Sequence, residues 1–133
     1  MRVSKLNTSL LALAFGLAAC ASNPDQQLTL EQKLEKRNYT LGPTVDRVEN
    51  YRITGFNSLD DFHVIIHSSP SRSYLVTLRM RCHNLDTAEN LAFSTTVGSV
   101  TDKDKLLVRS GAAGYTEQCF IDSLQELNKV TPS

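Results

Sequence analysis

The sequence predicts a mainly β fold of the α+β class: an antiparallel meander sheet of five or six short strands, with a short N-terminal helix and a short C-terminal helix. Three observations predict this fold. Apolar and polar residues alternate along several short segments, turn-forming residues separate these segments, and helical signals occur only near the two ends. Because short consecutive strands favour antiparallel pairing, we expect one sheet face to pack under the terminal helices and the other to face water.

Alternating hydrophobicity indicates where the strands lie. The strongest strand is expected from Tyr74 to Cys82, where every second residue is apolar and Met80 belongs to the buried face. Ser68-Ser69-Pro70-Ser71 supplies a turn before it. Together the expected strands cover residues 51–56, 62–67, 74–82, 91–97, 105–109 and 115–121.

Helix-start signals occur at both ends of this β-rich region. Thr29-Leu30-Glu31-Gln32 has the pattern of a capping box and predicts a helix of about ten residues. The Gly-Pro pair at 42–43 would end any such helix. Near the C-terminus, Asp122 is expected to cap a short closing helix that carries Leu124 and Leu127.

Residues 1–19 have the layout of a secretory signal peptide. Arg2 and Lys5 precede an unbroken apolar run from Leu10 to Ala19, and no acidic residue lies among them. Ten helical residues span about 15 Å, roughly half of the hydrocarbon core of a bilayer. The run is therefore too short for an ordinary transmembrane helix, and we expect residues 1–19 to be removed as a signal.

Leu17-Ala18-Ala19-Cys20 closes this run and resembles the lipobox of bacterial lipoprotein precursors. The resemblance implies cleavage before Cys20, a diacylglycerol on its thiol, and an acyl chain such as palmitate on the new amino terminus. Several acyl chains make a durable membrane anchor, whereas one chain binds only marginally. The alternative is an ordinary signal peptide that leaves Cys20 unmodified.

The residue after the lipobox bears on the destination of the protein. An Asp at this place usually retains proteobacterial lipoproteins in the inner membrane, and this chain has Ala21 instead. The resemblance therefore implies a cell-envelope protein that is lipid-anchored on the periplasmic face of the outer membrane. Residues 20–43 are expected to form the lipidated cysteine, a polar tether and the short helix, and residues 44–130 a single periplasmic β-rich domain.

Cys82 and Cys119 remain once Cys20 is assigned to lipid. An even pair in an oxidising compartment predicts a disulfide, here closing a loop of about 37 residues. The alternative is a metal or redox pair. No Cys-x-x-Cys motif is present, and neither cysteine has a second thiol near it in sequence.

Several short motifs resemble a group of small uncharacterised proteobacterial lipoproteins. They are Tyr74-Leu75, Cys82, Leu85, Phe93-Ser94 and the terminal run from Cys119 to Leu124. The resemblance covers about residues 45–128. It brings no known activity, so it supports the export and disulfide predictions without implying a reaction.

Histidines are the first candidates for chemistry. His63 and His67 are separated by Val64-Ile65-Ile66, which favours a strand, and four strand residues place two side chains about 13 Å apart. That spacing is too long for one metal ion, so no metal site is expected here. No cofactor and no catalytic residue are expected either. The alternative is a small periplasmic hydrolase or metal-binding protein that uses His63, His67 and His83.

Arginines are the second candidates. Arg79 and Arg81 are expected on one strand face, with Arg72 and Arg109 near them if their strands pair. Such a stripe suits the carboxylate or phosphate groups of envelope polymers or lipids. The alternative is a solvated sheet face that neighbouring acids balance.

The charge of the chain narrows the class of partner. The 14 basic and 14 acidic residues cancel, which gives no support to nucleic-acid binding. No catalytic signature such as Gly-x-Ser-x-Gly is present. The sequence therefore predicts a non-enzymatic binding or accessory module, held to the membrane by the lipid on Cys20, with an envelope protein or polymer as its partner.

Overall fold

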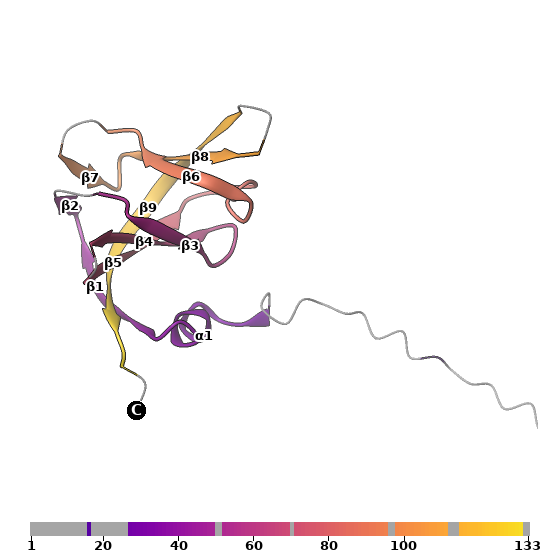
Figure 1. The fold of residues 1–133 in the computed structure, drawn as a ribbon, viewed down its shortest axis with the longest axis vertical. Coiled ribbons are helices and arrows are strands. Elements are labelled where there is room, and N and C mark those ends of the chain that lie inside the picture. Colours follow the sequence, from indigo (N-terminus) through magenta and orange to yellow (C-terminus); the bar gives the residue numbers. More distant parts are fainter. Residues whose placement is uncertain are drawn as a thin grey trace, which may run out of the picture.

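A computed structural model describes residues 16, 27–49, 52–69, 71–95, 98–111 and 115–131. Strands account for nearly all of the regular structure in these ranges, and one short helix lies at the edge of the sheet (Figure 1). The elements are α1 (Leu30–Glu35), β1 (Tyr39–Val45), β2 (Arg47–Glu49), β3 (Gly55–Ser58), β4 (His63–Ser69), β5 (Arg72–Leu78), β6 (Ala88–Phe93), β7 (Ser99–Thr101), β8 (Lys105–Ser110) and β9 (Thr116–Lys129).

Seven strands form one antiparallel, nearly closed sheet in the order β3-β4-β5-β9-β8-β6, with β1 also paired to β9. The remaining strands, β2 and β7, pair with each other as a separate two-stranded ribbon. The mainly β, antiparallel prediction is thus confirmed. The meander is confirmed only in part, because β5 is followed across the sheet by β9 rather than by the next strand in sequence.

The long strand β9 joins the two parts of the sheet. Its N-terminal half pairs with β8, where Cys119 lies opposite Leu106. Its C-terminal half lies between β5 and β1, and Leu127 pairs with Ser73 on one side and with Leu41 on the other. The last strand in sequence is therefore the centre of the fold.

Apolar residues gather in two cores on opposite sides of the sheet. The inner core fills the nearly closed sheet and consists of Val48, Val64, Ile66, Tyr74, Val76, Leu78, Cys82, Leu85, Phe93, Val100, Leu106, Val108, Cys119, Ile121 and Leu124. The outer core lies under α1 and consists of Leu34, Ile65, Leu75 and Leu127. Residues Val64, Ile65 and Ile66 are all buried, because successive side chains of β4 enter alternate cores. The expected water-facing side of the sheet is wrong for β4 and β5.

The Cys82–Cys119 disulfide is present and lies in the inner core. It joins the loop after β5 to β9 across a sequence separation of 37 residues. On the chain-entropy account, closing such a loop stabilises the folded state by about 4 kcal/mol. The predicted cysteine pairing is confirmed.

The predicted C-terminal helix is wrong, since residues 122–129 belong to β9. Thr77 pairs with Ser123, but Leu78 pairs with Ile121, so Asp122 is an extra residue in a β-bulge. The bulge shifts the alternation, and the inner-core residues Ile121 and Leu124 therefore lie three apart. That spacing resembles one face of a helix.

The strand expected over 74–82 ends at Leu78. Beyond it the chain leaves the sheet, with the Arg79 N–H donating to the Phe120 carbonyl and the Cys82 N–H donating to the Asp61 carbonyl. Met80, which was expected on the buried face, is 70% exposed as a result.

The N-terminal segment is part of the fold. The capping box is confirmed, because Thr29 Oγ1 accepts from the Gln32 N–H and Gln32 Oε1 accepts from the Thr29 N–H. The expected domain boundary at residue 44 falls inside β1, so the folded unit begins earlier. Cys20 and the expected signal peptide, apart from residue 16, lie outside the described residues. Within the described ranges, no helix has the length and apolar character needed to cross a bilayer.

Candidate functional site

A polar hollow of about 370 Å³ opens where the ends of several strands meet. We call it the His67 hollow. Its lining offers hydroxyl groups, one imidazole and one ammonium group. Its lining residues are Tyr39, Thr54, Gly55, His67, Ser71, Ser73, Leu127 and Lys129.

Strand register brings these side chains together from distant parts of the sequence. His67 on β4 pairs with Ser73 on β5, and Ser73 pairs with Leu127 on β9. Lys129 at the end of β9 pairs in turn with Tyr39 at the start of β1. Since paired residues project to the same sheet face, four strands place their polar side chains around one depression.

A hydrogen-bonded chain orders the floor of the His67 hollow. Tyr39 Oη lies 3.3 Å from Ser73 Oγ, and Ser73 Oγ lies 2.9 Å from His67 Nδ1. On the other side of the ring, Asn57 Nδ2 lies 2.8 Å from His67 Nε2. With the amide donating to Nε2, the neutral ring carries its proton on Nδ1 and donates it to Ser73. The imidazole is thus fixed at both nitrogens.

The electrostatics of the hollow favour an anion. Burial, together with the nearby Lys129 ammonium, lowers the pKa of His67 from its ordinary value. The lining residues that the structure describes include Lys129 but no Asp or Glu. An anion bound here would offset the charge of Lys129 and accept hydrogen bonds from the hydroxyl groups.

The four arginines expected to form one stripe are not brought together. Arg72, at the start of β5, borders a shallow depression beside the His67 hollow that also contains Glu126. Arg79 and Arg81 follow the end of β5, where Arg79 Nε donates to the Ile121 carbonyl. Arg81 Nε forms an exposed ion pair with Asp61 at 3.3 Å.

Arg109 lies far from Arg72 because β9 separates them. Arg109 pairs with Thr116 at one end of β9, whereas Ser73, the neighbour of Arg72, pairs with Leu127. Eleven strand residues span about 36 Å. The stripe over Arg72, Arg79, Arg81 and Arg109 is therefore corrected, since it required β5 to continue past Leu78 and to lie beside β8.

The three histidines also have separate partners. His63 Nδ1 lies 2.8 Å from Asp60 Oδ1, and the same carboxylate receives Lys33 Nζ at 2.9 Å. His83 Nδ1 lies 3.3 Å from Glu117 Oε1. Among the described residues, no group of three potential metal donors contains a histidine. The structure therefore does not assemble the metal site that the alternative prediction assigned to His63, His67 and His83.

Hydrogen bonds hold two of these carboxylates in the ionised form. Burial works to raise the pKa of Asp60, but bonds from His63, Lys33 and the Phe62 N–H outweigh it and lower the pKa. Burial has the same opposing effect on Glu117, whose pKa is lowered by the N–H groups of His83 and Asn84 and by the His83 ring. Each ionised carboxylate therefore holds a neighbouring segment in place by hydrogen bonds, Asp60 at residues 62–63 and Glu117 at residues 83–84.

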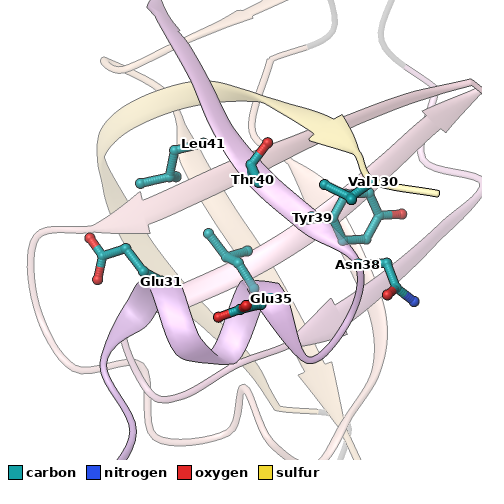
Figure 2. A pocket seen from close by; sticks show the side chains of 8 residues that line it. Glu31, Glu35, Asn38, Tyr39, Thr40, Leu41 and Val130 are labelled. Atoms are coloured by element: carbon teal, nitrogen blue, oxygen red, sulfur yellow. The ribbon is translucent and has the colours of Figure 1, made fainter. Parts of the chain in front are cut away.

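A second hollow, of about 410 Å³, lies between α1 and β1 (Figure 2). Leu34, Leu41 and Val130 give it an apolar surface, while α1 contributes Glu31 and Glu35. It shares Tyr39 with the His67 hollow. Because its charged residues are acidic, this hollow does not suit an anion.

Comparison with known proteins adds a family without an assigned activity. The model of a family of unknown function, DUF6491, matches residues 3–131. The chain belongs to the DUF6491 family. No match to a curated protein or to a solved structure was found. The expectation of an uncharacterised family is confirmed, whereas lipid attachment at Cys20 stays a prediction.

The residues of the His67 hollow were mostly missed in the sequence of this DUF6491 member. Among these residues the sequence patterns single out only His67, as part of the alternative metal site or hydrolase. No pattern marks Lys129, and Tyr39 falls in the segment expected before the domain. A signal did exist in the serines around a predicted hairpin turn, but without the register of β9 nothing linked Ser73 to Lys129.

Proposed function

We propose that this protein is a cell-envelope lipoprotein whose folded domain binds an anionic group of an envelope polymer or lipid in the His67 hollow. The lipobox-like segment that ends at Cys20 supports attachment to the periplasmic face of the outer membrane. The polar residues 21–27 then serve as a tether to the domain. In this arrangement the protein is a binding or accessory module rather than an enzyme.

One observation carries the ligand class: the hollow combines an ammonium group, an imidazole and several hydroxyl groups, and none of its described lining residues carries a carboxylate. Carboxylates and phosphates accept hydrogen bonds and carry a negative charge. Among the described lining residues, none offers such a charge to Lys129. The His67 ring adds a second positive charge when it is protonated. Anion binding is therefore expected to strengthen as the pH falls through the lowered pKa of His67, provided that the anion stays ionised.

Titration of the mature chain with inorganic phosphate and with acetate tests the site. The protein would comprise residues 20–133 with Cys20→Ser, and amide chemical shifts would be followed by NMR. We expect saturable shifts centred on Thr54, His67, Ser73 and Lys129. Phosphate binding without an acetate effect would identify a phosphate site, and the converse a carboxylate site.

Charge-matched variants separate a site from general attraction. Lys129→Gln is expected to weaken binding at least about tenfold, since a hydrogen bond to a charged group typically contributes about 1.5–3 kcal/mol. Lys103→Gln removes the same charge from the exposed turn before β8 and should leave binding unchanged. Equal effects of the two substitutions, or shifts spread over all surface lysines, would contradict the proposal.

The membrane attachment has its own test. Mass spectrometry of the protein from cell envelopes should show an amino terminus at Cys20 with diacylglycerol and an acyl chain. Cys20→Ala should abolish this mass and release the protein from the membrane fraction. An unmodified mature chain in the soluble periplasmic fraction would contradict the anchor while leaving the anion site to its separate experiment.

A serine hydrolase is the second candidate, because Ser73 Oγ lies 2.9 Å from His67 Nδ1. A nucleophilic serine needs a base that accepts its proton. Here the bond from Asn57 to Nε2 leaves the proton on Nδ1, so the ring donates to Ser73 instead. Labelling of Ser73 by a fluorophosphonate probe would favour the hydrolase.

A further inference from the structure

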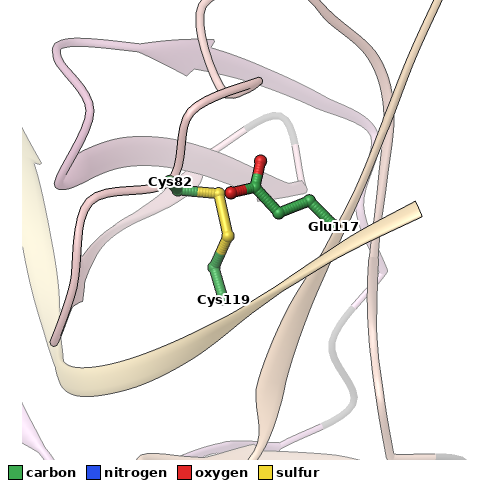
Figure 3. Close-up of side chains that lie close together, drawn as sticks. All are labelled: Cys82, Glu117 and Cys119. Carbon is green, nitrogen blue, oxygen red and sulfur yellow. A yellow bond between two sulfur atoms is a disulfide. The ribbon is translucent and has the colours of Figure 1, made fainter. Parts of the chain in front are cut away.

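The disulfide lies beside a carboxylate rather than against apolar side chains alone. Figure 3 shows the Glu117 carboxylate directed at the sulfur of Cys82, with Cys119 on the other side of the S–S bond. The potential donor atoms of Cys82, Glu117 and Cys119 all lie within 4.8 Å of one another. Among the described residues, this is the one group of three potential metal donors in the fold.

The donor set matches a zinc-type ion when the sulfurs are reduced. Tetrahedral zinc takes thiolate sulfur at about 2.3 Å and carboxylate oxygen at about 2.0–2.2 Å, which places neighbouring donors about 3.3–3.8 Å apart. The Cα atoms of the two cysteines are 5.8 Å apart, so opening the disulfide needs little backbone movement to reach that spacing. His83 Nδ1 lies 3.3 Å from Glu117 Oε1 but outside the group of three donors, so its exposed side chain has to turn toward the sulfurs to act as a fourth ligand.

The candidate ligands are mostly shielded from solvent, and the site is open on the side of His83. Cys82 and Cys119 are 0% and 5% exposed, and the Glu117 side chain is 15% exposed. The His83 side chain is 74% exposed, so the site opens to solvent on that side. An ion entering there would meet a carboxylate already fixed by the N–H groups of His83 and Asn84.

We propose that the reduced protein binds a divalent zinc-type ion through Cys82, Cys119 and Glu117, with His83 as the fourth ligand, and that disulfide formation expels the ion. This site is independent of the His67 hollow. In the envelope location proposed above, the ion would hold the loop after β5 against β9 until the cysteines are oxidised.

The redox step balances with a dithiol reductant and a disulfide oxidant. The dithiol gives two electrons and two protons, so that its sulfurs join while the Cys82–Cys119 bond breaks to two thiols. The divalent ion then forms two metal–sulfur bonds and releases both thiol protons to water. During reoxidation the oxidant takes two electrons from the thiolates and two protons from water as its own S–S bond breaks, the protein disulfide re-forms, and the ion leaves.

Cobalt(II) is the probe for this site, because a tetrahedral thiolate site gives it a sulfur-to-metal charge-transfer band and intense visible bands. The mature chain with Cys20→Ser would be reduced with a phosphine, freed of reductant without air, and titrated with cobalt and then zinc. We expect one equivalent of cobalt to develop both bands and zinc to remove them. The oxidised protein should give neither band, and their absence in the reduced protein would overturn the proposal.

Two substitutions test the ligands. Loss of an outer-shell partner typically costs 10–100-fold in metal affinity, so loss of a direct ligand in Glu117→Gln should cost at least about tenfold while the sulfur bands remain. His83→Ala should weaken binding without removing those bands. Glu89→Gln, on the exposed part of β6, is the matched control. An affinity of Glu117→Gln equal to that of Glu89→Gln would overturn the assigned ligand set.

Circular dichroism covers the case in which the reduced chain unfolds. Metal binding then appears as folding, because a ligand set that exists only in the folded state couples the two. Recovery of the β spectrum on adding zinc would support the proposal, and a chain that stays unfolded with saturating zinc would overturn it. Thermal unfolding of each oxidised variant shows whether the substitution itself perturbs the fold.

Discussion

Asp60 is the side chain whose protonation should matter most for stability. It accepts hydrogen bonds from Lys33 Nζ at 2.9 Å, His63 Nδ1 at 2.8 Å and the Phe62 N–H at 2.8 Å. These bonds lower its pKa in the folded state from the ordinary value of 3.8. A lowered folded-state pKa stabilises the protein above the unfolded value, and that stabilisation is lost as the pH falls.

Asp60→Asn should therefore destabilise the fold by roughly 1–3 kcal/mol at pH 7, because charge-assisted bonds are replaced by weaker ones. The difference between wild type and variant should narrow steadily below about pH 4. Urea unfolding across this pH range measures it. Asp61→Asn is the control, since its ion pair with Arg81 is exposed and worth little. A constant difference from pH 7 to pH 3 would contradict the assigned cause.

At the level of elements, two β-bulges explain why the sequence pattern failed to predict β1 and the second half of β9. In β1, Leu41 pairs with Leu127 and Thr44 with Gln125, so Gly42-Pro43 contributes one extra residue. Proline is tolerated at a bulge in an edge strand, whereas the sequence pattern indicated only a helix stop. The second bulge, at Asp122, changed the spacing of apolar residues in β9 from two to three. Alternation thus predicted β4, β8 and the first half of β9, but it missed β1 and misassigned the second half of β9.

Gly42 offers a direct test of the β1 bulge. A Cβ at this position would lie 2.9 Å from the backbone carbonyl oxygen of Glu126, which cannot move without disturbing β9. Gly42→Ala should destabilise the domain by about 1–3 kcal/mol, the usual cost of overpacking. Gly55→Ala is the matched control in another strand, because the nearest atom to its Cβ is a His67 carbon at 3.5 Å.

Thermal and urea unfolding of the two glycine variants measure the difference. The Gly55→Ala variant should remain within about 0.5 kcal/mol of wild type, as expected for a substitution without a steric conflict. Equal stabilities of the two variants would show that β1 can move away from β9 at this point.

At the scale of the whole molecule, the sequence predicted the kind of secondary structure and the disulfide better than it predicted which strands pair. The disulfide followed from two remaining cysteines, and the β-rich class followed from several alternating segments. The His67 hollow did not follow, because Ser73 and Lys129 become neighbours only through the pairing of β5, β9 and β1. The register between distant strands depends on how their apolar faces pack together in the folded protein. The pattern within a single segment does not contain that information.

The folded unit requires its N-terminal elements. A chain that begins at residue 44 lacks α1 and most of β1, so it leaves the C-terminal edge of β9 unpaired and removes Leu34 from the outer core. Loss of one such buried leucine typically costs 2–5 kcal/mol, out of a total of about 5–15 kcal/mol for a domain. We expect this chain to be largely unfolded at 25 °C, whereas a chain that begins at residue 27 should melt like the mature protein. Equal melting temperatures would contradict this account.

The central position of β9 has a consequence for biosynthesis. Residues 116–129 are synthesised after all the other described strands, yet β5, β8 and β1 all pair with them. A nascent chain without these residues lacks the strand that joins β5, β8 and β1, and contacts such as Tyr39 with Lys129 span most of the domain. The upstream strands therefore gain a common sheet only after the residues of β9 have been synthesised. Until then the polypeptide holds separate hairpins, and isolated hairpins are marginally stable at best.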